Sequence, residues 1–177
     1  MRPVLSAVVG ALALIVSGTM GALAVEEIKP PFSLSWGETS ARLERLLNGA
    51  KAKISERRKL DDGREAWYVD GLIQPGLKRT VFYFRKGQLV EVELQYQKPD
   101  WDQSQYDAYM SQVRSVLDRR FGQGQLLARK TEPAGDVLQT VVGWKWNQNN
   151  ASIEMYYYSA EDPAQVFRTL SVHYKTN

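Results

Sequence analysis

The sequence predicts an α+β protein in which an antiparallel sheet has two helices packed on one face. Several short segments alternate between apolar and polar residues, which is the pattern of strands with one buried face. Two other segments repeat their apolar residues every three or four positions, which is the period of a helix. The 177 residues, of which 44% are hydrophobic, suffice for one domain with a packed core.

The first 24 residues have the layout of a secretory signal peptide. Arg2 precedes a long apolar stretch, and Ala22 and Ala24 supply small side chains before the first acidic residues. An uncleaved membrane anchor is the alternative, because the apolar stretch is nearly long enough to span a bilayer. The polar and small residues at 17–19 interrupt the stretch and favour cleavage after Ala24.

We therefore expect a mature chain that begins at Val25, located in the periplasm of a bacterium or secreted from it, with no membrane span left after processing. Expression in a Gram-negative host should give a periplasmic protein whose intact mass corresponds to residues 25–177. Recovery of the protein from the membrane fraction with its N-terminus intact would contradict this prediction. Residues 25–177 are expected to form a single α+β domain.

Composition excludes several classes of site. The chain has no cysteine, so disulfides, thiol nucleophiles and thiolate metal sites are excluded. His173 is the single histidine, which excludes a conventional zinc site. A net charge of +3 gives no support for nucleic-acid binding. Since no glycine-rich phosphate loop, HExxH or GxSxG motif occurs, the sequence predicts no cofactor, no metal and no enzymatic activity.

The first half of the mature chain reads as a short helix followed by two hairpins. Thr39 is the predicted N-cap of the helix, and Asn48-Gly49 marks its end. The first hairpin turns at Asp61-Asp62-Gly63 and the second at Lys86-Gly87. The predicted core residues of this half are Leu43, Leu46 and Leu47 on the helix and Phe82, Phe84, Val90, Val92, Leu94 and Tyr96 on the second hairpin.

The second half repeats this order. A long helix is expected within residues 101–122, with Gly122 as its C-cap, and strands are expected near residues 126–131, 137–146, 152–159 and 167–175. Trp144 and Trp146 correspond in this order to Phe82 and Phe84 of the first half. The order suggests two copies of a helix-plus-strands unit, residues 32–98 and 100–177.

Alternation also separates core residues from candidate binding residues. Trp144 and Trp146 are expected to face the core. The opposite face is expected to carry Tyr83, Arg85, Lys145, Tyr156, Tyr158 and His173, together with Glu91, Glu93, Glu154 and Ser171. Tyrosine next to arginine and carboxylate is typical of a recognition surface. A solvated sheet face, on which tyrosines occur because of β-propensity alone, is the alternative.

Two possible catalytic features remain weak. Glu91 and Glu93 lie two residues apart on one strand, so about 7 Å of rise separates them, which is close to the carboxyl spacing of inverting glycosidases. Alternating charge on an exposed strand produces the same spacing. His173 as a general base would need a nucleophile and an orienting carboxylate, which the sequence does not place.

The segment "FSLSWGETSARLERLL", followed by aromatic strand pairs, resembles the superfamily of β-lactamase-inhibitor proteins and the small lipoprotein of the outer-membrane assembly machinery. The resemblance rests on Trp36-Gly37 and the helix start that follows. It implies helix-plus-sheet units that bind proteins or stabilise an envelope assembly without catalysis. The chain lacks the lipidated cysteine of the lipoprotein members and the disulfides of the inhibitors, and no binding residue is carried over.

Together these observations predict a non-enzymatic protein-interaction module of the bacterial cell envelope. Its partner is expected to be an envelope or secreted protein that binds to the outer face of the sheet. An envelope glycan that stacks on the exposed tyrosines is the alternative ligand.

Overall fold

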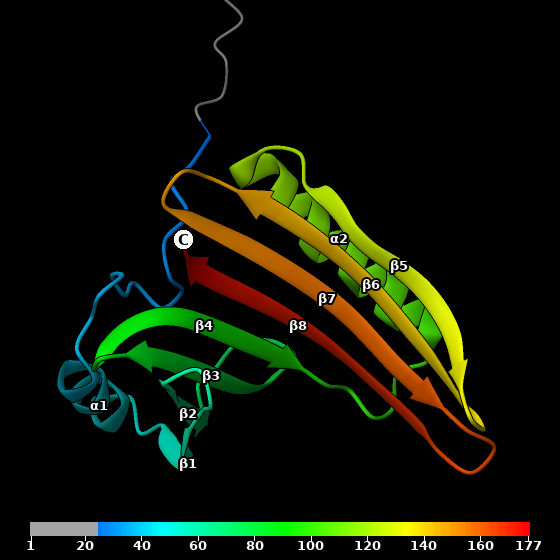
Figure 1. Ribbon diagram of the computed structural model, residues 1–177, viewed down its shortest axis with the longest axis horizontal. Helices are drawn as coiled ribbons and strands as arrows, with labels where there is room; N and C mark the ends of the chain where they lie inside the picture. Colours follow the sequence, from blue (N-terminus) through cyan, green and yellow to red (C-terminus); the bar gives the residue numbers. More distant parts are fainter. Residues whose placement is uncertain (1–24) are drawn as a thin grey trace, which may run out of the picture.

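The computed structural model describes residues 25–177, and the predicted signal peptide lies outside the described residues (Figure 1). All eight strands join one antiparallel sheet in the order β1-β2-β3-β4-β8-β7-β6-β5. The elements in chain order are α1 (Ser40–Gly49), β1 (Lys53–Lys59), β2 (Arg64–Asp70), β3 (Leu77–Arg85), β4 (Gln88–Tyr96), α2 (Gln103–Phe121), β5 (Gln125–Ala134), β6 (Val137–Asn147), β7 (Ala151–Glu161) and β8 (Val166–Thr176).

The predicted α+β class is wrong. Half of residues 25–177 are in strands and 19% in helices, so the fold is largely one antiparallel sheet to which two helices are added. The physical reason is that alternation reveals only strand residues with a buried side chain. The strand predicted at residues 126–131 is longer in the structure, where β5 spans Gln125–Ala134, because this almost wholly exposed edge strand pairs with β6 through its backbone.

The sheet is continuous across the middle of the chain. Each half supplies one helix followed by four strands, and the last strands of the halves, β4 and β8, pair at the centre. Figure 1 shows α2 running along the half formed by β5 to β8, and α1 beside the start of β4. The side chains of both halves therefore meet over the β4–β8 pair.

One face of the sheet carries the core. A row of paired residues crosses six neighbouring strands on this face and consists of Trp67, Phe82, Val92, Tyr174, Ile153 and Trp146. The prediction that Trp146 faces inward is confirmed, since only 2% of it is exposed. Trp144 faces the same way but is half-buried, and the Arg114 guanidinium lies 3.5 Å from its ring centre.

Both helices bury their apolar side in this core. α1 begins after the predicted Thr39 cap and buries Leu43 and Leu47, whereas Leu46, a predicted core residue, is 47% exposed. The prediction that Leu46 is a core residue is wrong, because a short helix contacts the sheet along a narrow stripe of side chains. α2 ends at Gly122, as predicted. It buries Tyr106, Leu117 and Phe121.

The segment before α1 links the two halves. Ile28 is fully buried, and its backbone N–H donates to Gln148 Oε1 at 2.8 Å. Trp36 Nε1 donates to the Ile28 carbonyl at 3.3 Å, and Gly37, at φ 77°, donates its N–H to Leu89 of β4. These contacts hold residues 25–37 along the core side of the sheet.

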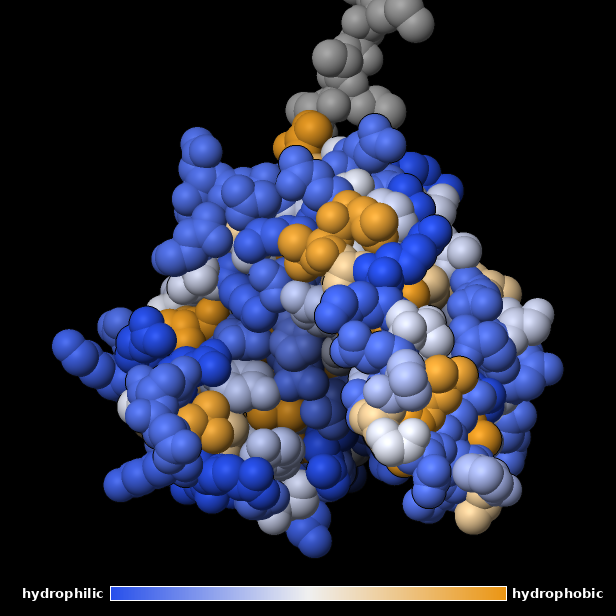
Figure 2. Space-filling view, turned by 45° about the vertical axis from the view of Figure 1, so that its right-hand side comes forward, coloured by the Kyte–Doolittle hydropathy of each residue, from blue (hydrophilic) through white to orange (hydrophobic). Residues whose placement is uncertain are grey.

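Figure 2 shows a largely hydrophilic surface with separate hydrophobic clusters and a hollow near its middle. No helix in the described part of the chain is long and apolar enough to cross a membrane.

Candidate functional site

The predicted binding residues lie on the sheet face opposite the core, which we call the polar face. Strand pairing arranges this face in rows. One row holds Val81, Glu93, His173, Glu154 and Lys145, the next holds Tyr83, Glu91 and Lys175, and a third holds Gln95, Ser171 and Tyr156. Residues from the two halves of the chain therefore stand side by side across β4 and β8.

Glu91 is the centre of the polar face, although only 7% of it is exposed. Arg64 Nη1 donates to its Oε2 at 2.5 Å, and His173 Nδ1 lies 2.9 Å from its Oε1. Lys175 Nζ lies 4.0 Å from the same Oε1. The sequence suggested a solvated strand carboxylate here, but the structure buries it among three basic side chains.

Glu93 is a second buried carboxylate in the neighbouring row, with 8% exposed. The Tyr83 hydroxyl donates to its Oε2 at 2.6 Å, and Gln95 Nε2 donates to its Oε1 at 2.8 Å. Each oxygen of the carboxyl group thus has a hydrogen-bond donor within the sheet face, as burial of a polar group requires. The Tyr83 ring is fixed at the same time.

Glu154 is a third carboxylate of the polar face and binds two lysines and a tyrosine. Lys175 Nζ donates to it at 2.7 Å, Lys145 Nζ lies 3.2 Å away, and the Tyr156 hydroxyl donates at 3.1 Å. The Tyr156 ring also lies on Gly143 of β6, where an added Cβ would be 2.7 Å from a ring carbon. Gly143 therefore makes room for this ring.

The charges of the network are set by these contacts. Burial alone would raise the pKa of Glu91, but the hydrogen bond from His173 and the charges of Lys175 and Arg64 lower it below its ordinary value. Burial would likewise raise the pKa of Glu154, but its contacts, mainly the hydrogen bond and charge of Lys175, lower it below its ordinary value. Burial and the neighbouring Glu93 raise the pKa of Tyr83. At neutral pH Glu91 and Glu154 are ionised and Tyr83 keeps its proton.

The six predicted binding residues are not one uniform exposed patch. Tyr83, Lys145, Tyr156 and His173 are half-buried members of the hydrogen-bonded network. Tyr158 is half-buried one row further along, with its ring centre 6.1 Å from that of Phe167. Arg85 is exposed at the end of β3.

Sequence reasoning missed Arg64 and Lys175, which hold the central carboxylates. Lys175 lies two residues after His173 on one strand, so alternation was a signal that could have found it. Arg64 gave no such signal, because it comes from β2 and reaches Glu91 only through the pairing of β2, β3 and β4.

A small cavity opens on the polar face beside Ser171, with a volume of about 240 Å³. It is lined by Lys78, Arg79, Glu93, Gln95, Gln97, Phe167, Thr169 and Ser171. Small-molecule pockets usually hold roughly 300 Å³ or more. The cavity is therefore suited to a single side chain or sugar ring of a larger partner.

Ser171, His173 and Glu91 form a chain of contacts, because His173 Nε2 lies 3.1 Å from Ser171 Oγ. A serine, histidine and carboxylate in this order activate the nucleophile in many hydrolases. Here β8 is paired on both sides, so its backbone N–H groups serve the sheet and do not form an oxyanion hole. The arrangement is better suited to holding polar groups in place than to acyl transfer.

Within residues 25–177 no group of three or more His, Asp or Glu side chains could hold a metal ion. Comparison with family models, curated proteins and solved structures gave no match to the chain. The polar face itself is thus the basis for a functional proposal.

Proposed function

We propose that the protein is a binding module of the bacterial cell envelope that docks a protein partner through the polar face. The observation that carries the proposal is the network in which Glu91, Glu93 and Glu154 hold tyrosine and basic side chains in fixed positions. Side chains already ordered in the free protein lose little entropy on binding. Tyrosine and arginine are also the residues that dominate binding energy at protein interfaces.

A glycan is the second candidate ligand. The cavity beside Ser171 combines the amide groups of Gln95 and Gln97 with the half-exposed ring of Phe167. Hydrogen-bonding amides next to an aromatic ring suit a sugar. This candidate requires rings and amides rather than positive charge.

The docking proposal predicts that Tyr156→Ala combined with Tyr158→Ala removes on the order of 2 kcal/mol of partner binding, as expected for interface hot spots. The measurement is recovery of envelope proteins by the immobilised variant and by wild type, with a thermal melt of each. Arg119→Ala, on α2, is the matched control and should recover the same proteins as wild type. Unchanged recovery by a folded double variant would contradict docking on this face.

Two further variants test the role of the Tyr156 ring and the kind of ligand. Gly143→Ala keeps Tyr156 but displaces its ring, so it should weaken recovery of the same proteins. Arg85→Ala separates the two candidates, because a protein partner uses charged and aromatic residues together, whereas a glycan would be indifferent to this exposed arginine.

A further inference from the structure

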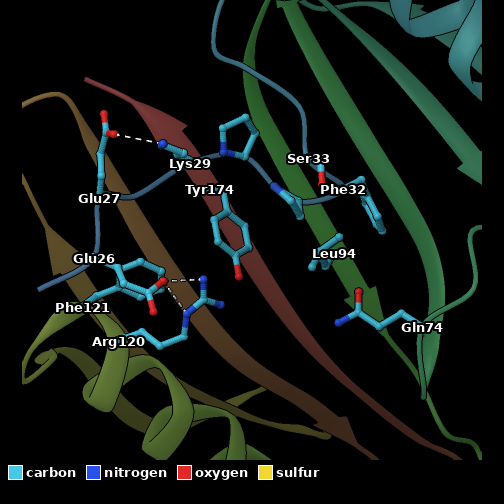
Figure 3. Close-up of a pocket in the computed structure, with 12 residues that line it drawn as sticks. Glu26, Glu27, Lys29, Phe32, Ser33, Gln74, Leu94, Arg120, Phe121 and Tyr174 are labelled. Carbon is cyan, nitrogen blue, oxygen red and sulfur yellow. Dashed lines mark hydrogen bonds and ion pairs between the residues drawn. The ribbon is translucent and has the colours of Figure 1, made fainter.

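The helix-bearing side of the molecule carries a groove that the proposed docking face does not involve. Two cavities of about 550 and 350 Å³ lie over the β4–β8 pair. They share Gln74, Leu94, Arg120 and Tyr174, so they are two parts of one groove. Figure 3 shows the larger cavity between the end of α2 and the segment from Glu26 to Ser33.

The larger cavity forms the polar end of the groove. Arg120 donates to Glu26 Oε2 through Nε at 2.9 Å and Nη2 at 2.8 Å. The two side chains are 51% and 53% exposed, so the pair contributes little to stability and a ligand can replace Glu26 at little cost. Tyr174 and Arg120 both border this cavity, and Figure 3 shows the phenol ring and the guanidinium facing the same space.

The smaller cavity forms the apolar end. Leu94, Tyr96 and Val172 provide its floor, and the side chains of α2 provide one wall through Tyr109, Val113, Val116 and Leu117. Val116 remains 38% exposed, and Ile73, next to the lining residue Gln74, is fully exposed. The groove thus joins a mainly apolar cavity to a more polar one, and Arg120 and Tyr174 border both.

The walls of the groove favour a hydrocarbon chain over a peptide. β4 and β8 are paired on both sides, and the backbone of α2 is engaged within the helix, so the apolar end of the groove offers few backbone partners. The Gln74 amide already donates to the Tyr96 hydroxyl at 2.9 Å. A peptide lying here would leave N–H and C=O groups unpaired, which is costly, whereas a hydrocarbon chain has no such groups.

We propose that this groove binds a single-chain amphiphile with an anionic headgroup. The chain lies against Leu94 and Val172 in the apolar cavity. The headgroup accepts hydrogen bonds from the Arg120 guanidinium, in place of the Glu26 carboxylate, and from the Tyr174 hydroxyl.

Calorimetric titration of the purified protein with dodecanoate, below the concentration at which it forms micelles, tests the proposal. Wild type should bind at one saturable site. Arg120→Gln should weaken binding roughly tenfold or more, because hydrogen bonds to charged groups are among the stronger ones. Glu26→Gln should strengthen binding, because it removes the competing carboxylate. Arg119→Gln is the control and should bind as wild type does, since Arg119 borders a different depression on α2.

Dodecyltrimethylammonium, with the same chain and the opposite charge, should bind much more weakly than dodecanoate. Val116→Lys should weaken binding of dodecanoate by placing a charge at the apolar cavity. Thermal melts establish that each variant is folded. The absence of saturable binding by wild type, equal affinity for the cationic amphiphile, or equal affinity of folded Arg120→Gln and wild type would each overturn the proposal.

Discussion

Replacing Trp146 with alanine is expected to lower the free energy of unfolding by about 3 to 5 kcal/mol. The ring is 2% exposed and lies against Gly124, where an added Cβ would be only 2.6 Å from a ring carbon. Its Nε1 donates to Asp118 Oδ1 of α2 at 2.9 Å. The substitution removes buried apolar area, leaves a cavity and breaks a hydrogen bond between β6 and α2.

Trp144→Ala is the matched control for this prediction. Trp144 faces the same side of β6 but is half-buried, and Arg114 covers its ring. Its removal is expected to cost about 1 to 2 kcal/mol, from partial burial and one cation–π contact. Urea unfolding of wild type and both variants gives the comparison. A loss below about 1 kcal/mol for Trp146→Ala, or equal losses for the two, would contradict the difference in burial.

Glu91→Gln is expected to lower the free energy of unfolding by about 2 kcal/mol at neutral pH. Breaking a buried ion pair by removing one partner costs about 3 to 5 kcal/mol. The expected loss is smaller because Arg64, His173 and Lys175 keep side-chain exposures of 24%, 18% and 31%, where solvent can replace part of the interaction. The glutamine keeps the shape of the side chain, so the loss reports on the charge.

The stability difference between wild type and Glu91→Gln should also depend on pH, in a direction that follows from the pKa of Glu91. The folded state lowers the pKa of Glu91 below its ordinary value of 4.5. A group of this kind stabilises the fold fully above its unfolded pKa, and the stabilisation is lost as the pH falls through the folded pKa. The difference in unfolding free energy between wild type and Glu91→Gln should therefore be largest at neutral pH and shrink below about pH 4.5.

Urea unfolding of both proteins from pH 7 to pH 3 measures this difference. Glu154, whose pKa is also lowered, protonates in the same range in both proteins. Because both carboxylates contact Lys175, repeating the comparison with Glu154→Gln in both proteins isolates Glu91. A difference that stays constant over the whole range would show that the charge of Glu91 is not the source of the stabilisation.

Short stretches of the sequence are enough to predict the local features of this protein. The Thr39 cap, the Gly122 end of the long helix and the inward direction of Trp146 all follow from residues within a few positions of one another. Capping depends on one side chain and the next turn of backbone, and strand alternation depends on neighbouring residues. Such signals are complete within a short stretch of chain.

Which strands pair, and therefore which charges meet, depends on the packing of distant segments. Alternation specifies the face of a residue but not the neighbour of its strand, and so the sequence predicts an antiparallel sheet without the order of its strands. The pairing of β4 with β8 brings Glu91 within 2.9 Å of His173, which lies 82 positions away in the sequence. The candidate site consists of contacts of this kind, so burial of Glu91 had no local signal.

The groove on the helix side has the same origin. Its Arg120–Glu26 pair joins residues 94 positions apart, and its floor exists only because strands from both halves of the chain lie side by side. Residue type and period specify what a segment can bury locally. The pairing of distant segments determines what that buried surface contacts. Chain connectivity alone does not determine this pairing, because strands far apart in the sequence meet only when the sheet packs together.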